Sequence, residues 1–592
     1  MKQKMKMIIR TPHDALMNTL RSEDTILLML AIVIGLFSGL GAVGFIELIA
    51  LFREIFWIPW GGVFTGYTPG DLKVLLIPLL PAIGGLVAGP IGSLFPAEAK
   101  GQGVPEVMES VIMRGGILKM RTIFIRLFTS AICIGSGGSA GREGPIAQIG
   151  SAVGSYTAQV FKLSTNNTRT LLGAGAAGGI AATFNAPLAG TLFALEIILG
   201  EWHAAAFSPV IMSSVVATTV GRYIHGNIHA FDVPYYQLVN PMEIGLYIVL
   251  GILTGLTALL FILTQDRFET FFNGKVKIHP WLKPALGGLI LGFIGLAFPQ
   301  IFGNGYGPMG TALMGNMAFG LMFALIFLKI IATSLTLGSG GSGGVFAPTL
   351  YIGAMVGGTF GSVVHTLFPA ITATKGAYAL VGMGALCGAA CHAPLTSILL
   401  LFEITGDYHI ILPIMVACIV SNLTIRGIFP HSIDTLKLHK KGINVKAGVE
   451  ATLLQELKVK DAMTFDVERI PQGMRFGEIV RHITKSKYSS FPVVDNDDHL
   501  VGILSFQDVR EHVFEPELED LIVAKDVANM HNVITIAPSD SLKDALGKLA
   551  YRNVEHLVVL DPKDPRRILG ILTRRDIISA YKKAIFRYEK TG

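Results

Sequence analysis

Two glycine-rich tracts carry the residues whose spacing points most directly to chemistry. "GSGGSAGREGP" covers 135–145 and "GSGGSGGVFAP" covers 338–348, at an offset of 203 residues (338 − 135), and most positions are identical. Each tract ends in a proline that precedes a helical pattern, and proline suits the first helical turn because its missing N–H would be unpaired there. Glycines let backbone amides approach a ligand closely. Since a helix N-terminus carries partial positive charge and free N–H donors, the two tracts predict a binding site for a small anion.

Other interpretations of the first tract are weaker. A phosphate-binding P-loop would end in Gly-Lys-Ser/Thr, whereas this tract continues with Arg142 and Glu143. A dinucleotide-binding fingerprint needs a preceding strand, and the preceding "IFIRLFTSAICI" resembles a membrane segment. Close helix packing through small residues explains many of the 68 glycines. It does not explain a carboxylate in an apolar tract.

The composition places these tracts in a membrane. The chain has 592 residues, of which 51% are hydrophobic and 15% charged, and its mean hydropathy is +0.56, which is typical of a membrane protein. Apolar runs begin at Ile26, Val74 and Ile248, and several are short or broken by Gly and Pro, as in transporters with discontinuous helices. The basic N-terminal segment predicts a cytoplasmic, uncleaved end. The net charge of +6 is therefore attributed to cytoplasmic segments, and no nucleic-acid partner is expected.

The membrane part is duplicated. Besides the two tracts, "FNAPLAGTLFALEI" from Phe184 matches "CHAPLTSILLLFEI" from Cys391 at an offset of 207 residues (391 − 184). Duplication in a membrane protein is typical of a transporter with two halves, whose substrate site lies where the halves meet. We find no arrangement typical of a hydrolytic enzyme, so no enzymatic activity is expected. The cysteines are expected to be buried by packing, and no metal site is expected.

A second, soluble region begins after about Arg426, where charged residues become frequent. "GILSFQD" from Gly502 and "GILTRRD" from Gly570 align without a gap, and each follows a strand-like run and a helix-like run. This pattern predicts a tandem α/β repeat.

The motifs of the membrane part resemble those of the CLC family of chloride channels and proton-coupled chloride transporters. "GQGVP" (101–105), "GREGP" (141–145) and "GGVFAP" (343–348) are similar to the family's first, second and third motifs. The resemblance implies the CLC fold of two inverted repeats with broken and tilted helices, a homodimer, and one anion pathway in each subunit. Glu143 corresponds to the gating glutamate, whose carboxylate occupies the outer anion site when ionised and leaves it when protonated or displaced. The resemblance implies these anion-binding residues: Gln102, Gly103, Arg142, Gly144, Val345, Phe346 and Asp434.

Three positions depart from the family pattern. Gln102 replaces a serine whose hydroxyl faces the anion, and an amide N–H₂ can also donate to an anion. Asp434, in "SIDTLKL", replaces a tyrosine; an ionised Asp there repels an anion, so it points away, is protonated, or belongs to a different inner constriction. Ile197 replaces the inner glutamate that takes up protons in exchangers. Glu196 and its repeat counterpart Glu403 are expected to be structural.

Because Ile cannot relay a proton, the sequence favours a gated passive chloride channel. The alternative is a proton-coupled exchanger of chloride or another small anion such as fluoride. No cofactor is required for either activity, and the substrate is expected to be chloride.

The soluble repeat resembles a pair of CBS domains, which often bind adenine nucleotides (ATP, ADP or AMP). The matching pattern points to Ser505 with Asp508 and to Thr573 with Asp576 as ribose contacts. The simpler interpretation is that each pair caps the following helix. The tail is expected to regulate and to dimerise.

The expected organisation follows from these assignments. The chain is a polytopic α-helical membrane protein of the plasma (inner) membrane, followed by a cytoplasmic α/β tandem, with both termini cytoplasmic. The expected segments are an N-terminal segment (1–23), the anion-transport domain (24–430), a linker (431–457), the first CBS domain (458–515) and the second CBS domain (522–585).

Overall fold

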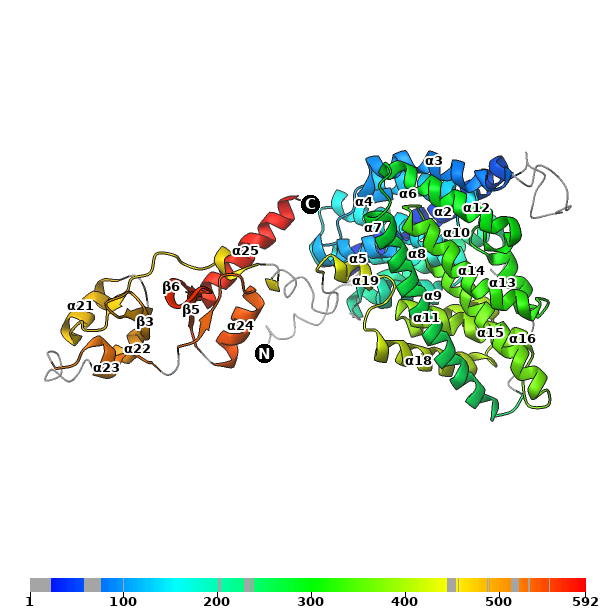
Figure 1. Cartoon of the computed structure of the whole chain (residues 1–592). Helices are drawn as coiled ribbons and strands as arrows, with labels where there is room; N and C mark the ends of the chain where they lie inside the picture. Colours follow the sequence, from blue (N-terminus) through cyan, green and yellow to red (C-terminus); the bar gives the residue numbers. More distant parts are fainter. Residues whose placement is uncertain are drawn as a thin grey trace, which may run out of the picture. The chain divides into compact units, whose positions relative to one another are not determined.

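The protein is described from a computed structural model, which divides into two compact units, Met1–Lys441 and Gly442–Gly592 (Figure 1). Residues 1–22 of the predicted N-terminal segment and residues 444–453 and 456 of the predicted linker lie outside the described residues. The structure describes residues 23–57, 76–99, 101–200, 204–227, 231, 236, 239–443, 454–455, 457–486, 488, 490–512, 521–530, 533–552 and 554–591.

Among the described residues, the first unit contains six segments that are long and apolar enough to cross a membrane. No more than 61% of each apolar window is buried within the unit, and many large apolar side chains on these helices are exposed. Such a surface is stable when it faces lipid, so the unit is a multi-pass membrane domain. The segments are α2 (Glu23–Trp57), α11 (Glu243–Gly274), η5 with α12 (Pro280–Ala297), α14 (Phe319–Gly338), α15 (Phe346–Leu367) and α18 (Ile411–Ile428).

Further helices complete the unit, and several of them are short, as the interrupted apolar runs predicted. The longer of them are α3 (Leu79–Leu94), α6 (Arg121–Gly135), α7 (Glu143–Val160), α8 (Thr165–Phe184), α10 (Ala204–His225), α16 (Lys375–Cys391) and α17 (Pro394–Thr405). The remainder are α4 (Pro96–Ala99), α5 (Val104–Met113), α9 (Pro187–Leu192), η4 (Phe193–Leu199), η6 (Pro299–Ile301), α13 (Tyr306–Leu313) and α19 (Thr435–Lys440). The sequence analysis placed residues 435–440 in a linker, whereas α19 packs against α5.

The duplication predicted from the sequence is visible in the helix packing. In one half α7 packs on α8, and in the other α15 packs on α16. Both crossings use glycine: a Cβ on Gly150 would lie 2.1 Å from the carbonyl oxygen of Gly175, and a Cβ on Gly353 would lie 2.4 Å from that of Gly382. Gly150, Gly175, Gly353 and Gly382 therefore allow close helix packing. This packing role is separate from the anion binding that the two glycine tracts predict.

The second unit contains two sheets with the same topology, which confirms the tandem repeat. In each, a short strand pairs in parallel with the middle strand, and the third strand pairs antiparallel with it. The strands are β1 (Ile470–Pro471), β2 (Ser490–Val494), β3 (Leu500–Ser505), β4 (Thr535–Ile536), β5 (His556–Asp561) and β6 (Asp564–Thr573). The helices are η7 (Val459–Asp461), α21 (Phe476–Lys485), α22 (Phe506–His512), α23 (Ala524–Val527), α24 (Leu542–Tyr551) and α25 (Arg574–Thr591).

The two repeats of the tail form one body. A buried cluster combines Val494 and Ile503 of the first repeat with Val558 and Ile568 of the second. Burying these side chains excludes water from the contact and stabilises the pair of repeats as a unit.

Candidate functional site

The two glycine tracts meet through a reciprocal pair of backbone hydrogen bonds. The N–H of Gly141 donates to the carbonyl of Gly344 at 2.7 Å, and the N–H of Gly344 donates to the carbonyl of Gly141 at 2.7 Å. These bonds hold the N-termini of α7 and α15 side by side. The prediction that the two tracts begin helices that converge is confirmed, because α7 starts at Glu143 and α15 starts at Phe346.

The loop that carries the first motif joins the same contact. Gly101 forms a parallel bridge with Ser342 of the second tract. A Cβ on Gly103, whose φ is +96°, would lie 2.4 Å from the carbonyl oxygen of Gly144, and a Cβ on Gly144 would lie 2.0 Å from the carbonyl oxygen of Gln102. Only glycine permits this approach of two backbones. All three motifs therefore lie at one place.

Glu143 is fully buried at this junction. Its Oε2 accepts a hydrogen bond from the N–H of Ala347 at 3.2 Å, in the first turn of α15. Its Oε1 accepts a hydrogen bond from the hydroxyl of Tyr306 at 2.6 Å. The carboxylate thus occupies a position at a helix N-terminus that suits a small anion.

Tyr306 is a site residue that the sequence analysis missed. It is the first residue of α13, far from the three motifs in sequence. Its ring lies under the Arg142 guanidinium, 4.8 Å from the ring centroid, and packs edge-on against Phe231. Arg142 thus contacts the tyrosine that binds the gate. A lone tyrosine in "GNGYGP" carries no pattern that would have identified it.

A small cavity lies beside the junction and gathers most of the predicted anion-binding residues. Five of them line it, whereas Gly103 and Arg142 do not; the N–H of Gly103 donates to Oε2 of Glu106 at 2.7 Å. Ile197, the third departure from the family pattern, also lines the cavity. The lining residues are Gln102, Val104, Gly144, Phe193, Ile197, Val345, Phe346, Cys391 and Asp434.

Two of the lining residues carry a buried side-chain oxygen that has no hydrogen-bond partner among the described residues. Oε1 of Gln102 and Oδ1 of Asp434 are buried and make no hydrogen bond within the part of the chain that the structure describes. Asp434 is 3% exposed and Gln102 is 5% exposed. Buried polar atoms are normally paired, so these two oxygens are free for a ligand, water or a proton.

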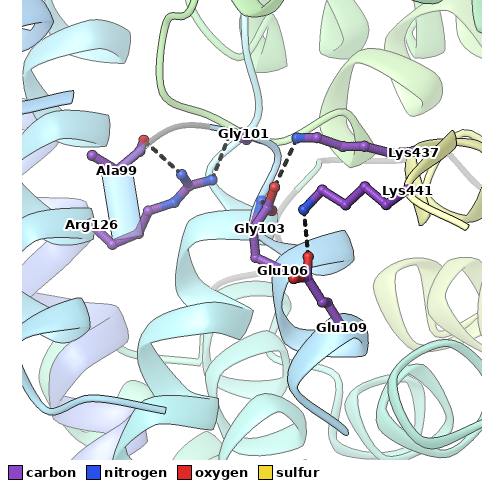
Figure 2. A network of polar contacts seen from close by, with 8 residues as sticks. All are labelled: Ala99, Gly101, Gly103, Glu106, Glu109, Arg126, Lys437 and Lys441. Carbon is purple, nitrogen blue, oxygen red and sulfur yellow. Dashed lines mark hydrogen bonds and ion pairs between the residues drawn. The ribbon is translucent and has the colours of Figure 1, made fainter. Parts of the chain in front are cut away.

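A network of ion pairs and hydrogen bonds holds the first-motif loop against α19, as Figure 2 shows. Lys437 donates to Oε1 of Glu106 at 2.8 Å. The buried Arg126 donates to the carbonyls of Ala99 at 3.0 Å and Gly101 at 2.8 Å. The network fixes the backbone on which Gln102 is carried. The sequence analysis did not identify these residues, although an arginine within the apolar "IFIRLF" is an unusual feature.

Asp434 lies between α18 and α19, outside the six candidate spans. Burial raises the pKa of Asp434 to about 7; the charge of Glu106 also raises it, and the charge of Lys437 lowers it. Desolvation disfavours the ionised form of a carboxyl group, so burial is the dominant cause. The protonated form of Asp434 is therefore favoured to a higher pH than that of an ordinary aspartate.

Glu196 and Glu403 have the structural role expected of them, and it is reciprocal. Glu403 of α17 accepts hydrogen bonds from the N–H groups of Leu188 at 2.9 Å and Ala189 at 2.7 Å, at the start of α9. Glu196 of η4 accepts from the N–H of Thr396 at 2.8 Å, at the start of α17. Each half thus caps a helix of the other half.

In the tail, the two predicted nucleotide-contacting pairs each form a helix cap. The hydroxyl of Ser505 donates to Asp508 at 2.6 Å, and the N–H of Asp508 donates back to that hydroxyl at 3.3 Å. Thr573 and Asp576 form the same pair of bonds at 2.6 and 3.2 Å. The capping interpretation describes these contacts, and nucleotide binding stays a prediction.

Comparisons with known proteins agree with these motifs. A family model described as "Voltage gated chloride channel" matches residues 84–426, and one described as "CBS domain" matches residues 459–515 and 524–583. The chain is 35% identical over 350 residues to a ClcB-like protein of Ralstonia nicotianae that is named as a chloride channel, with 58% of this chain and 81% of that protein covered.

Two further relatives are named as exchangers. The chain is 33% identical over 422 residues to the H(+)/Cl(−) exchange transporter ClcA of Vibrio cholerae serotype O1, with 70% of this chain and 89% of that protein covered. It is also similar to the crystal structure of a slow cyanobacterial Cl⁻/H⁺ antiporter, with a TM-score of 0.64, 28% identity, and 70% of this chain and 97% of that chain covered.

Proposed function

The chain belongs to the CLC family of chloride channels and transporters and carries a pair of CBS domains, and from this premise we propose that it exchanges chloride for protons across the membrane. The observation that carries the proposal is the position of Glu143. Its carboxylate accepts a hydrogen bond from the first turn of α15, where an anion would bind.

Ile197, taken alone, favours a passive channel. The relatives named as exchangers, one of them 33% identical over 422 residues, favour the alternative, a proton-coupled exchanger. Membership of the family and transport of anions are common to both interpretations. The exchanger is therefore the proposed function, and the role of Ile197 needs another explanation.

The mechanism follows from competition for the same amides. The ionised carboxylate of Glu143 occupies the N-terminus of α15 and excludes the anion. A proton that binds the carboxylate removes its charge and weakens its attraction to the helix dipole. The neutral side chain then leaves, chloride takes its place, and the return of the carboxylate releases the proton and expels the ion. The movements of chloride and protons are thereby coupled, because chloride and the Glu143 carboxylate compete for one binding site.

The anion is bound without a full positive charge in direct contact. Lys437, the lysine nearest to the cavity-lining Asp434 in sequence, is already paired with Glu106 at 2.8 Å. Backbone dipoles attract an anion while letting it leave again, as rapid transport requires. We take chloride as the substrate because the relatives are named for it.

Reconstituted liposomes test the proposal. An outward chloride gradient should drive protons uphill into the vesicles in wild-type protein, and Glu143→Gln should abolish proton movement while chloride still flows. Glu54→Gln, which alters an exposed glutamate of α2, is the matched control and should behave as wild type. Chloride flow without proton movement in wild-type protein would refute the exchanger.

We also propose that the protein is a homodimer of the inner membrane and that both termini are cytoplasmic.

We propose in addition that the CBS pair binds an adenine nucleotide and regulates transport. The complete Ser/Thr and Asp pairs in both repeats support the nucleotide site. Asp576→Ala in the full-length protein should weaken ATP binding measured by calorimetry. Asp544→Ala is the matched control, because Asp544 forms the same cap with Ser541 on α24, with bonds of 2.6 and 3.1 Å. Equal effects of both variants would refute a nucleotide contact at Asp576.

A further inference from the structure

One carboxylic acid lines the cavity beside the two tracts. Asp434 is 3% exposed, and it is the one carboxyl group among the nine described residues that line this cavity. Ile197 lines the same cavity. Asp434, which replaces the expected tyrosine, therefore shares a cavity with Ile197, which replaces the expected inner glutamate.

The contacts of Asp434 leave its buried Oδ1 without a structural role. Asp434 stands at the N-cap position of α19 but makes no capping hydrogen bond. Ser432 takes that role, because its hydroxyl accepts a hydrogen bond from the N–H of Thr435 at 3.1 Å. Oδ1 of Asp434 has no partner within the described residues. A buried acceptor without a partner lowers the stability of the folded protein. Oδ1 of Asp434 therefore does not stabilise the fold.

The charges around Asp434 suit a group that gains and loses a proton. Glu106 of α5 and Lys437 of α19 act on it electrostatically, and the thiol of Cys391 of α16 lines the same cavity. Lys437 is paired with Glu106 at 2.8 Å, so its charge is largely compensated. The other lining side chains, from α5, η4 and α15 and the loop at Gln102, carry no charge. Burial raises the pKa of Asp434 to about 7, and a pKa close to the working pH suits a group that both takes up and releases a proton.

We propose that Asp434 is the inner proton-transfer residue of this transporter and replaces the glutamate that Ile197 displaces. The inference rests on the proposed exchange function. In the first step, a hydronium ion on the side of the membrane from which the tail continues gives its proton to Oδ1 of Asp434. An O–H bond of the hydronium breaks, an O–H bond of the carboxyl group forms, and water leaves. The proton then passes by way of water to the carboxylate of Glu143, whose neighbour Gly144 lines the cavity, and Asp434 becomes ionised again.

The same chemistry makes the coupling obligatory. An ionised Asp434 repels an anion in the shared cavity, whereas a protonated one does not. Chloride therefore passes the cavity when Asp434 holds a proton, and the unpartnered oxygen of Gln102 offers an acceptor for the carboxyl proton or for the water that carries it. Proton loading and anion passage are linked at a second point in addition to Glu143.

The test uses the full-length protein in liposomes, with chloride flux and proton movement recorded together. Asp434→Asn should retain chloride flux and lower proton movement driven by a chloride gradient by at least about tenfold. Asp434→Glu, which keeps a carboxyl group, should retain coupling, and adding Ile197→Glu to Asp434→Asn should restore part of it. Asp266→Asn is the matched control, since Asp266 pairs with Lys440 of α19 and its loss perturbs the same helix without touching the cavity.

The outcomes separate the inference from the proposed function. Wild-type protein that moves no protons would overturn both. Coupled transport in wild type that persists unchanged in Asp434→Asn would overturn only the role of Asp434. In wild-type protein, chloride flux should also change when the pH on the tail side is varied through about 7. Chloride flux that does not depend on the pH of the tail side would overturn the inference even if the Asn variant does not fold.

Discussion

The hydroxyl of Tyr306 is expected to hold the gate closed, and its removal gives a quantitative prediction. Tyr306→Phe deletes one oxygen, while the ring keeps its contacts with Arg142 and Phe231. The lost bond is 2.6 Å long, partly buried, and made to a carboxylate. Hydrogen bonds to charged groups contribute about 1.5–3 kcal/mol, so the seated carboxylate should be destabilised by about that amount.

This free energy has a measurable consequence. Since about 1.4 kcal/mol corresponds to one pH unit, the pH of half-maximal chloride flux should rise by about 1–2 units. The assay is chloride efflux from liposomes over a series of pH values. The midpoint rises because the ionised carboxylate of Glu143 is less stable in its position at the N-terminus of α15. A lower proton concentration is then enough to release it.

A matched tyrosine provides the control. The hydroxyl of Tyr351 is also buried, but it donates to a backbone carbonyl, that of Gln300, at 3.3 Å. Tyr351→Phe should therefore leave the pH of half-maximal flux unchanged. An unchanged or more acidic midpoint in Tyr306→Phe would refute the argument that the phenol stabilises the seated carboxylate.

Three further outcomes are expected. Gly144→Ala should abolish transport and lower the yield of folded protein, because its Cβ would lie 2.0 Å from a backbone oxygen; size-exclusion profiles and chloride efflux measure this. Glu403→Ala should lower the thermal unfolding midpoint in detergent, since it removes two amide hydrogen bonds with an expected cost of about 1.5–3 kcal/mol. Burial lowers the pKa of His556, so the unfolded tail binds the proton more readily, and tail stability should fall as pH decreases below about 6.5; hydrogen exchange at β5 in the full-length protein measures this.

The sequence predicted the parts of the site that are made of backbone. Glycine and proline dictate where chains approach and where helices begin, and these preferences are local. The convergence of the two tracts and the presence of a helix at the end of each could therefore be predicted, although α7 begins at Glu143, two residues before the expected Pro145. The duplicated order of motifs then indicated the two-half architecture.

The parts that the sequence did not reveal depend on tertiary contacts. Tyr306 and Lys437 reach the site from helices far away in the chain. The same holds for Asp434: its replacement of a tyrosine was visible, but its missing cap bond and its unpartnered oxygen appear only when α19 is placed. Ile197 alone suggested a channel, and only the shared cavity shows that an acid stands nearby.

Coupling between chloride and protons in the wild-type protein tests the central claim most directly. With an imposed chloride gradient and no proton gradient, wild-type liposomes should accumulate or release protons against the gradient that they build, and this movement should stop when the chloride gradient is collapsed. Dissipation of the chloride gradient without any proton movement would contradict the account and identify the protein as a passive anion pathway.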